Sequence, residues 1–96
     1  MNAFCCEERI VLCFELAGVE KESIDLVAEP RRLRVRGVRP PPEPPQCDGP
    51  FAQILALEID HGAFEREITL PTEIDPEGVR AEQRNGLLWV QLPVRR

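Results

Sequence analysis

The feature of this sequence that most constrains its fold is an alternation of apolar and polar residues, broken by turn residues at short intervals. In Leu33-Arg34-Val35-Arg36, for example, every second side chain is apolar, which is the period of a half-buried β-strand. The pattern predicts seven strands, at residues 9–16, 23–28, 33–38, 51–59, 64–70, 79–83 and 87–92. Strands at such intervals, with no confident helix between them, indicate an all-β antiparallel sandwich.

Turn residues separate the predicted strands. Asn85-Gly86 is the strongest of these signals, because both residues tolerate the positive φ that a two-residue hairpin turn requires. Pro30 and Pro71 end the strands before them, since proline cannot donate to a strand ladder. The sequence therefore predicts a closing hairpin between residues 79–83 and 87–92.

A chain of 96 residues suits one domain, which we expect at residues 9–96 after a short N-terminal arm at residues 1–8. A Pro-rich loop at residues 39–50 interrupts this domain, and residues 40–50 alone hold six of the ten prolines. Its prolines favour extended polyproline geometry, but as a ligand motif their spacing is weak. The apolar residues at about 51–59 then predict a strand that leaves the loop.

The charge balance argues against nucleic acid as a partner, and the length of the apolar runs argues against a membrane span. Twelve basic and 17 acidic residues give a net charge of −5, although five arginines lie within residues 31–39. A negative domain with no aromatic residue among those arginines is a poor partner for a phosphate backbone. The longest apolar runs are far shorter than the ~20 residues of a membrane span, and residues 1–8 do not resemble a signal peptide.

Residues that could carry catalysis or bind a metal are few. The one histidine, His61, lies in a turn, and the four cysteines form no Cys-x-x-Cys pair. The sequence therefore predicts no enzyme, no metal and no cofactor, and it favours reduced thiols in the cytoplasm. One alternative stays open at this point, a thiol-based redox enzyme that uses Cys5 or Cys6.

Four segments, in this order, resemble the α-crystallin domain of small heat-shock proteins, in the form found in bacteria and archaea. They are Phe14-Glu15-Leu16-Ala17-Gly18-Val19 with Glu22-Ser23-Ile24; Leu33-Arg34-Val35-Arg36-Gly37; Glu58 to Arg66 with Leu70-Pro71; and Ala81-x-x-x-Asn85-Gly86-Leu87-Leu88. Each piece alone is weak, but the combination over about residues 9–94 is specific. The resemblance implies an immunoglobulin-like β-sandwich and an ATP-independent holdase that binds partly unfolded clients and forms dimers or small oligomers.

The resemblance also implies two binding regions and a signature hairpin. A groove for a partner's Ile-x-Ile/Val tail would lie between Ile24, Leu26 and Ala28 on one side and Val79 and Ala81 on the other. In the dimer, the loop strand would reach the partner's first strand, with contacts from Phe51, Ile54, Leu55, Leu57, Ile59 and Arg66. The hairpin signature would be carried by Ala81, Asn85, Gly86 and Leu88.

Some features depart from the family pattern. The long N-terminal arm is missing, the first family strand is absent or reduced to residues 2–6, and no Ile-x-Ile tail follows Val94. These departures suggest a trimmed domain or a naturally minimal protein, and they disfavour large oligomers. The second alternative is a CS-domain-like co-chaperone that docks on another chaperone, which would share the sandwich and change the function.

Overall fold

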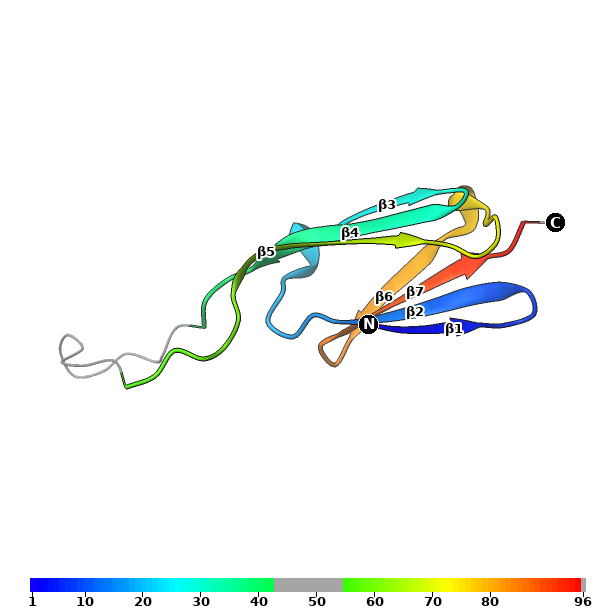
Figure 1. The fold of residues 1–96 in the computed structure, drawn as a ribbon. Coiled ribbons are helices and arrows are strands. Elements are labelled where there is room, and N and C mark those ends of the chain that lie inside the picture. Colours follow the sequence, from blue (N-terminus) through cyan, green and yellow to red (C-terminus); the bar gives the residue numbers. More distant parts are fainter. Residues whose placement is uncertain (43–54, 96) are drawn as a thin grey trace.

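Two antiparallel β-sheets face each other in the computed structural model, which describes residues 1–42 and 55–95 (Figure 1). The four-stranded sheet has the order β1-β2-β7-β6, with β1 at Asn2–Cys5, β2 at Arg9–Glu15, β7 at Leu87–Pro93 and β6 at Arg80–Arg84. The three-stranded sheet has the order β3-β4-β5, with β3 at Asp25–Glu29, β4 at Arg32–Arg39 and β5 at Gly62–Thr69. Two short 3-10 turns, η1 (Lys21–Ser23) and η2 (Pro76–Gly78), precede β3 and β6. The predicted all-β sandwich is confirmed.

The core follows from the alternation. In β2 the inward residues Ile10, Leu12 and Phe14 are buried, and Leu12 lies opposite Val90 of β7. Leu33 of β4 faces them from the other sheet and is fully buried. Because side chains alternate along a strand, one apolar face of each sheet closes the core between the two layers.

The outer face of the three-stranded sheet is charged. Arg32 pairs with Glu29 at 3.0 Å and with Glu67 at 2.9 Å, and Arg36 pairs with Asp25 at 2.9 Å. The hydrogen bond that Arg32 donates to Glu29, followed by the charges of Glu29 and Glu67, raises the pKa of Arg32 above its ordinary value. The arginine-rich strand thus finds its partners among carboxylates of the neighbouring strands.

Six of the seven predicted strands are present, with ends shifted by up to two residues. The N-terminal prediction is corrected, because Asn2–Cys5 is a strand, β1, that pairs with β2 inside the sheet. The loop-strand prediction at about residues 51–59 stays a prediction. Residues 51–54 lie outside the described residues, and residues 55–59 belong to no strand. Among the described residues, no strand pairs with residues 55–59, and a strand needs that pairing.

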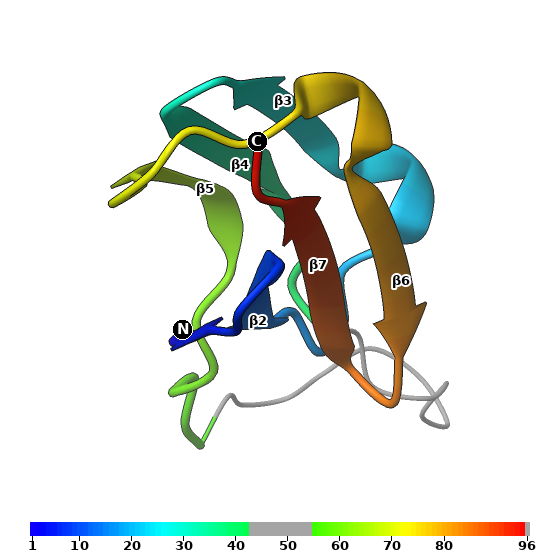
Figure 2. The same ribbon diagram turned by 90° about the vertical axis from the view of Figure 1, so that its right-hand side faces the viewer.

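The sheet orders leave both sides of the sandwich open. In Figure 2, β3 and β6, each at the edge of its sheet, lie on one side, while β5 lies on the same side as β1 and β2. An unpaired edge presents free backbone donors and acceptors. Both open sides are therefore candidate binding surfaces.

Candidate binding surfaces

The first surface consists of apolar side chains on the open side between β3 and β6. Ile24, Leu26 and Ala28 are half-buried and pack against the core, as does Val79 at the start of β6. Ala81 shares the inward face of β6, since it lies opposite the buried Val90, but it remains exposed. The structure thus brings the five predicted residues to two facing sheet edges, where their apolar surface is only partly covered.

One end of this open side is closed by a hydrogen bond that sequence analysis did not predict. The Nε2 atom of Gln83, in β6, donates to the backbone carbonyl of Val19 at 2.8 Å. Val19 is buried in the connection between β2 and β3. This bond ties one edge of the four-stranded sheet to the chain that leads into the other sheet. A glutamine at an inward position of a strand is the signal that could have identified it.

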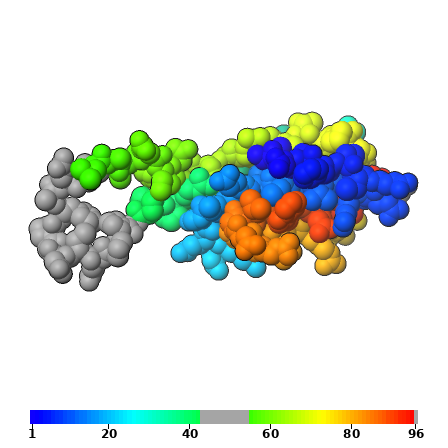
Figure 3. All heavy atoms as spheres, turned by 90° about the horizontal axis from the view of Figure 1, so that it is seen from below, coloured from blue at the N-terminus to red at the C-terminus, as the bar shows by residue number. Residues whose placement is uncertain are grey.

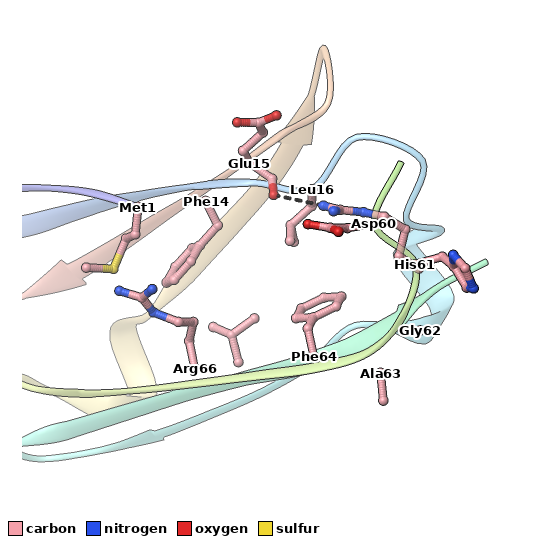
Figure 4. Close-up of a pocket in the computed structure, with 12 residues that line it drawn as sticks. Met1, Phe14, Glu15, Leu16, Asp60, His61, Gly62, Ala63, Phe64 and Arg66 are labelled. Atoms are coloured by element: carbon pink, nitrogen blue, oxygen red, sulfur yellow. Dashed lines mark hydrogen bonds between the residues drawn. The ribbon is translucent and has the colours of Figure 1, made fainter. Parts of the chain in front are cut away.

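The second surface is a cavity of about 310 Å³ on the opposite side of the sandwich (Figure 4). Phe14 of β2 and Phe64 of β5 line it, and the Arg66 side chain reaches across it toward Met1. Arg39 also lines it, and its Nη2 atom donates to the Glu15 carbonyl at 3.3 Å. The cavity therefore combines an apolar lining with two guanidinium groups.

The structure describes four of the six predicted dimer residues, which lie in β5 and in the segment that leads into it. Leu55, Leu57 and Ile59 are 89%, 80% and 67% exposed, and they alternate with the polar Glu58 and Asp60. Arg66 lines the cavity, while Phe51 and Ile54 lie outside the described residues. An apolar segment this exposed next to an open sheet edge has the pattern of a strand without its partner.

The signature hairpin has the predicted turn. Asn85 and Gly86 connect β6 and β7 with φ values of 53° and 76°, so the prediction of positive φ at both positions is confirmed. Leu88, just after the turn, is buried in the core. Ala81 and Asn85 are exposed, whereas Leu88 belongs to the core.

The residues considered for chemistry remain apart. His61 points away from the cavity in Figure 4, and its Nδ1 atom lies 3.5 Å from the Ile59 carbonyl. Cys5 and Cys6 are exposed and Cys13 is buried, all as free thiols. In residues 1–42 and 55–95, no three His, Cys, Asp or Glu side chains come together as a metal site. The same residues contain no helix of the length and apolar character needed to cross a bilayer.

Sequence analysis did not predict the cavity, because its lining comes from distant parts of the chain. Phe14 and Phe64 are 50 positions apart, and only the packing of β2 over β5 brings them together. The one available signal was Arg66, which matches the Phe-x-Arg part of the resemblance.

Comparison with known proteins points to one family. Residues 5–96 match the model of the Hsp20/alpha crystallin family. The 18 kDa antigen 1 of Mycobacterium avium is 34% identical over 94 residues, which cover 98% of this chain and 60% of that protein. The 18 kDa heat shock protein of Streptomyces albus G is 30% identical over 84 residues, or 88% of this chain and 56% of that protein. The chain spans about three-fifths of the length of these relatives.

Solved structures of the same family share the fold. Heat shock protein 16.0 from Schizosaccharomyces pombe superposes with a TM-score of 0.81 at 28% identity, covering 97% of this chain and 83% of that one. The hspA protein from Xanthomonas axonopodis gives 0.74 at 26% identity, covering 98% and 90%. These matches favour the small heat-shock interpretation over a CS-domain co-chaperone or a thiol enzyme.

Proposed function

The chain belongs to the Hsp20/alpha crystallin family, and we propose that it acts as an ATP-independent chaperone that holds partly unfolded proteins and associates with copies of itself. The observation that carries this proposal is the apolar surface that the single chain leaves uncovered. Leu55, Leu57 and Ile59 are exposed in the segment that leads into β5, and residues such as Leu26 at the β3 edge are only half-buried. A partly unfolded chain exposes apolar residues and unpaired backbone groups, which such edges can bind.

A binding experiment tests this function. A heat-treated monomeric enzyme is mixed with the chain without nucleotide, and the mixture is separated by size. We expect a complex that contains both proteins after heating and none with the native enzyme. Separate elution of the two proteins at every ratio would contradict client binding. Lys21→Ala, at the exposed turn η1, serves as a surface control that should bind as the wild type does.

Self-association is proposed to use the segment at about residues 51–59. In this interpretation, Leu55, Leu57 and Ile59 add a strand to the β1 edge of a second copy, next to the cavity that Arg66 lines. The alternation of these apolar residues supports it, because one face of the added strand would then be apolar throughout. The pairing would also cover an edge that stays open in a single chain.

The edges β3 and β6 are proposed to bind an extended apolar tail of a partner. Ile24, Leu26 and Ala28 would form one wall, with Val79 and Ala81 opposite. Main-chain hydrogen bonds to an edge strand give affinity, and alternate side chains give selectivity. The hydrogen bond between Gln83 and Val19 would limit how far such a tail extends.

Two further aspects rest on family membership and on the thiols. We propose that the chain binds its clients without catalysing a reaction on them. We also propose a cytoplasmic location, since Cys5 and Cys6 are exposed and free, which a reducing compartment maintains.

A further inference from the structure

The outer face of the four-stranded sheet carries an apolar centre that the core does not use. Because Ile10, Leu12 and Leu92 point inward, the residues between them in β2 and β7 point outward. On this outer face Trp89 lies opposite Cys13, Val11 lies opposite Gln91, and Phe4 of β1 lies beside Val11. Figure 3 views the molecule from this side, where β1 and β2 (blue) and the β6–β7 hairpin (orange) are visible.

The burial of these residues shows a partly covered apolar surface. Cys13 is only 7% exposed although it points away from the core, while Trp89, Val11 and Leu87 are half-buried. Phe4 is 50% exposed. Trp89 is the only tryptophan of the chain. An apolar group at the centre of a sheet face, surrounded by polar residues, is typical of a protein interface.

Charged residues lie at both ends of the same face. Arg9 of β2 and Arg80 of β6 lie at the end where β2 begins. Glu15 of β2 and Glu82 of β6 lie toward the other end, where Arg84 comes within 4.0 Å of Glu82. All five side chains are exposed. The face therefore carries two arginines at one end and, toward the other, two glutamates with Arg84 beside them, and the apolar centre lies between.

We propose that this face docks against the same face of a second copy, with the strands of the two copies running in opposite directions. A twofold axis between the Val11 row and the Cys13 row places Arg9 over the partner's Glu15 and Arg80 over the partner's Glu82. The same rotation places Val11 over the partner's Cys13 and Trp89 over the partner's Gln91. Each of these pairings then occurs twice, as a closed twofold interface requires.

The physical basis is the usual one for stacked sheets. Two sheets pack about 10 Å apart with strand directions within about 30°, so pairing at the rim needs only approximate register. Burial of the apolar centre supplies affinity, and the end charges select the antiparallel orientation over the parallel one. The surface differs from the β1 edge and from the β3 and β6 edges, so the inference stands independently of the proposed function.

Charge reversal with rescue tests the orientation. The chain of 96 residues is studied by sedimentation over a concentration series, in reducing buffer so that Cys5 and Cys6 form no disulfide. One association step should double the mass of the particle. We expect Arg9→Glu and Glu15→Arg each to raise the dissociation constant of this step about tenfold, because each variant places two pairs of like charges opposite each other. The combined variant Arg9→Glu/Glu15→Arg should have a dissociation constant within about threefold of the wild-type value. The matched swap Lys21→Glu/Glu22→Arg, at η1, should change nothing.

The fluorescence of Trp89 gives a second and independent readout. When the protein is diluted until the associated form dissociates, the emission should move to longer wavelength because Trp89 becomes exposed to water. In the single charge-reversal variants, this shift should already occur at concentrations at which the wild type is still associated. Single reversals that associate as tightly as the wild type would overturn the proposal. So would a combined variant as weak as either single one, or an emission spectrum that stays constant while the mass doubles.

Discussion

The backbone amide of Leu16 donates a 2.8 Å hydrogen bond to the carbonyl of Gly86, so the end of β2 is fastened to the turn between β6 and β7. Gly86 has a φ of 76°, and a Cβ atom added there would lie 3.4 Å from the Cβ atom of Ala17. The turn is thus fixed both by its own backbone conformation and by the chain that leaves β2.

Replacing Gly86 by valine should destabilise the fold. A β-branched residue resists positive φ, and its extra methyl groups would crowd Ala17. We expect a loss of about 2 kcal/mol in the free energy of unfolding, or a fall in Tm on the order of 10 °C. Asn85→Gly is the matched control at the other turn position and should cost less than about 0.5 kcal/mol. An unchanged Tm of Gly86→Val in thermal unfolding would refute this prediction.

Gln83→Leu should also lower stability, by about 1–2 kcal/mol, because the buried carbonyl of Val19 would lose its donor. The comparison is Gln91→Ala, which removes only the exposed hydrogen bond between Arg9 and Gln91. That change should stay below about 0.5 kcal/mol. Chemical denaturation measures both values, and equal effects of the two substitutions would argue against a structural role for Gln83.

Leu57→Asp should weaken self-association and leave the fold intact. The Leu57 side chain is 80% exposed in the single chain, so its loss costs the monomer little. If the segment adds a strand to a second copy, a charge on its apolar face should raise the dissociation constant at least tenfold. Light scattering gives the mass, and the neighbouring Glu58→Gln is the control. A dimer of unchanged mass and affinity would count against the exchanged strand.

Ala81→Arg should block the binding of an apolar tail at β3 and β6. Ala81 is exposed on the inward side of β6, so a large side chain can be accommodated there but would stand in the way of the proposed tail. With a labelled Ile-x-Ile peptide, fluorescence anisotropy should show at least tenfold weaker binding than for the wild type. Glu82→Gln, on the opposite face of the same strand, should bind normally. Equal affinities of Ala81→Arg and wild type would place the tail elsewhere.

Much of the fold could be predicted from the sequence, because its strands are half-buried and short. In β4 the alternation of Leu33 and Val35 with arginines identifies a strand with one buried face, and in the last hairpin Asn85-Gly86 identifies the turn. Strand β1 did not show this pattern. Its four residues are all exposed, so they have no alternation of buried and exposed positions from which a strand could be predicted. They form a strand through their pairing with β2.

The candidate surfaces could be predicted only where one strand carries them. Ile24, Leu26 and Ala28 follow the period of two along β3, so their common side was visible in the sequence. The cavity beside Phe14 and Phe64 depends on how two sheets stack, which no local pattern records. The segment at residues 55–59 shows the opposite limit, since its pattern predicts a strand and the single chain forms none there.

The measurement that tests the chaperone function most directly is the light scattering of a model enzyme that aggregates on heating, with increasing amounts of this chain and no nucleotide. The account predicts that aggregation is delayed in proportion to the chain added, and that ATP leaves the delay unchanged. The account would be contradicted if the scattering rose as fast as for the enzyme alone when the chain is present in several-fold molar excess. The chain must remain folded at that temperature. A delay that requires ATP would also contradict the account.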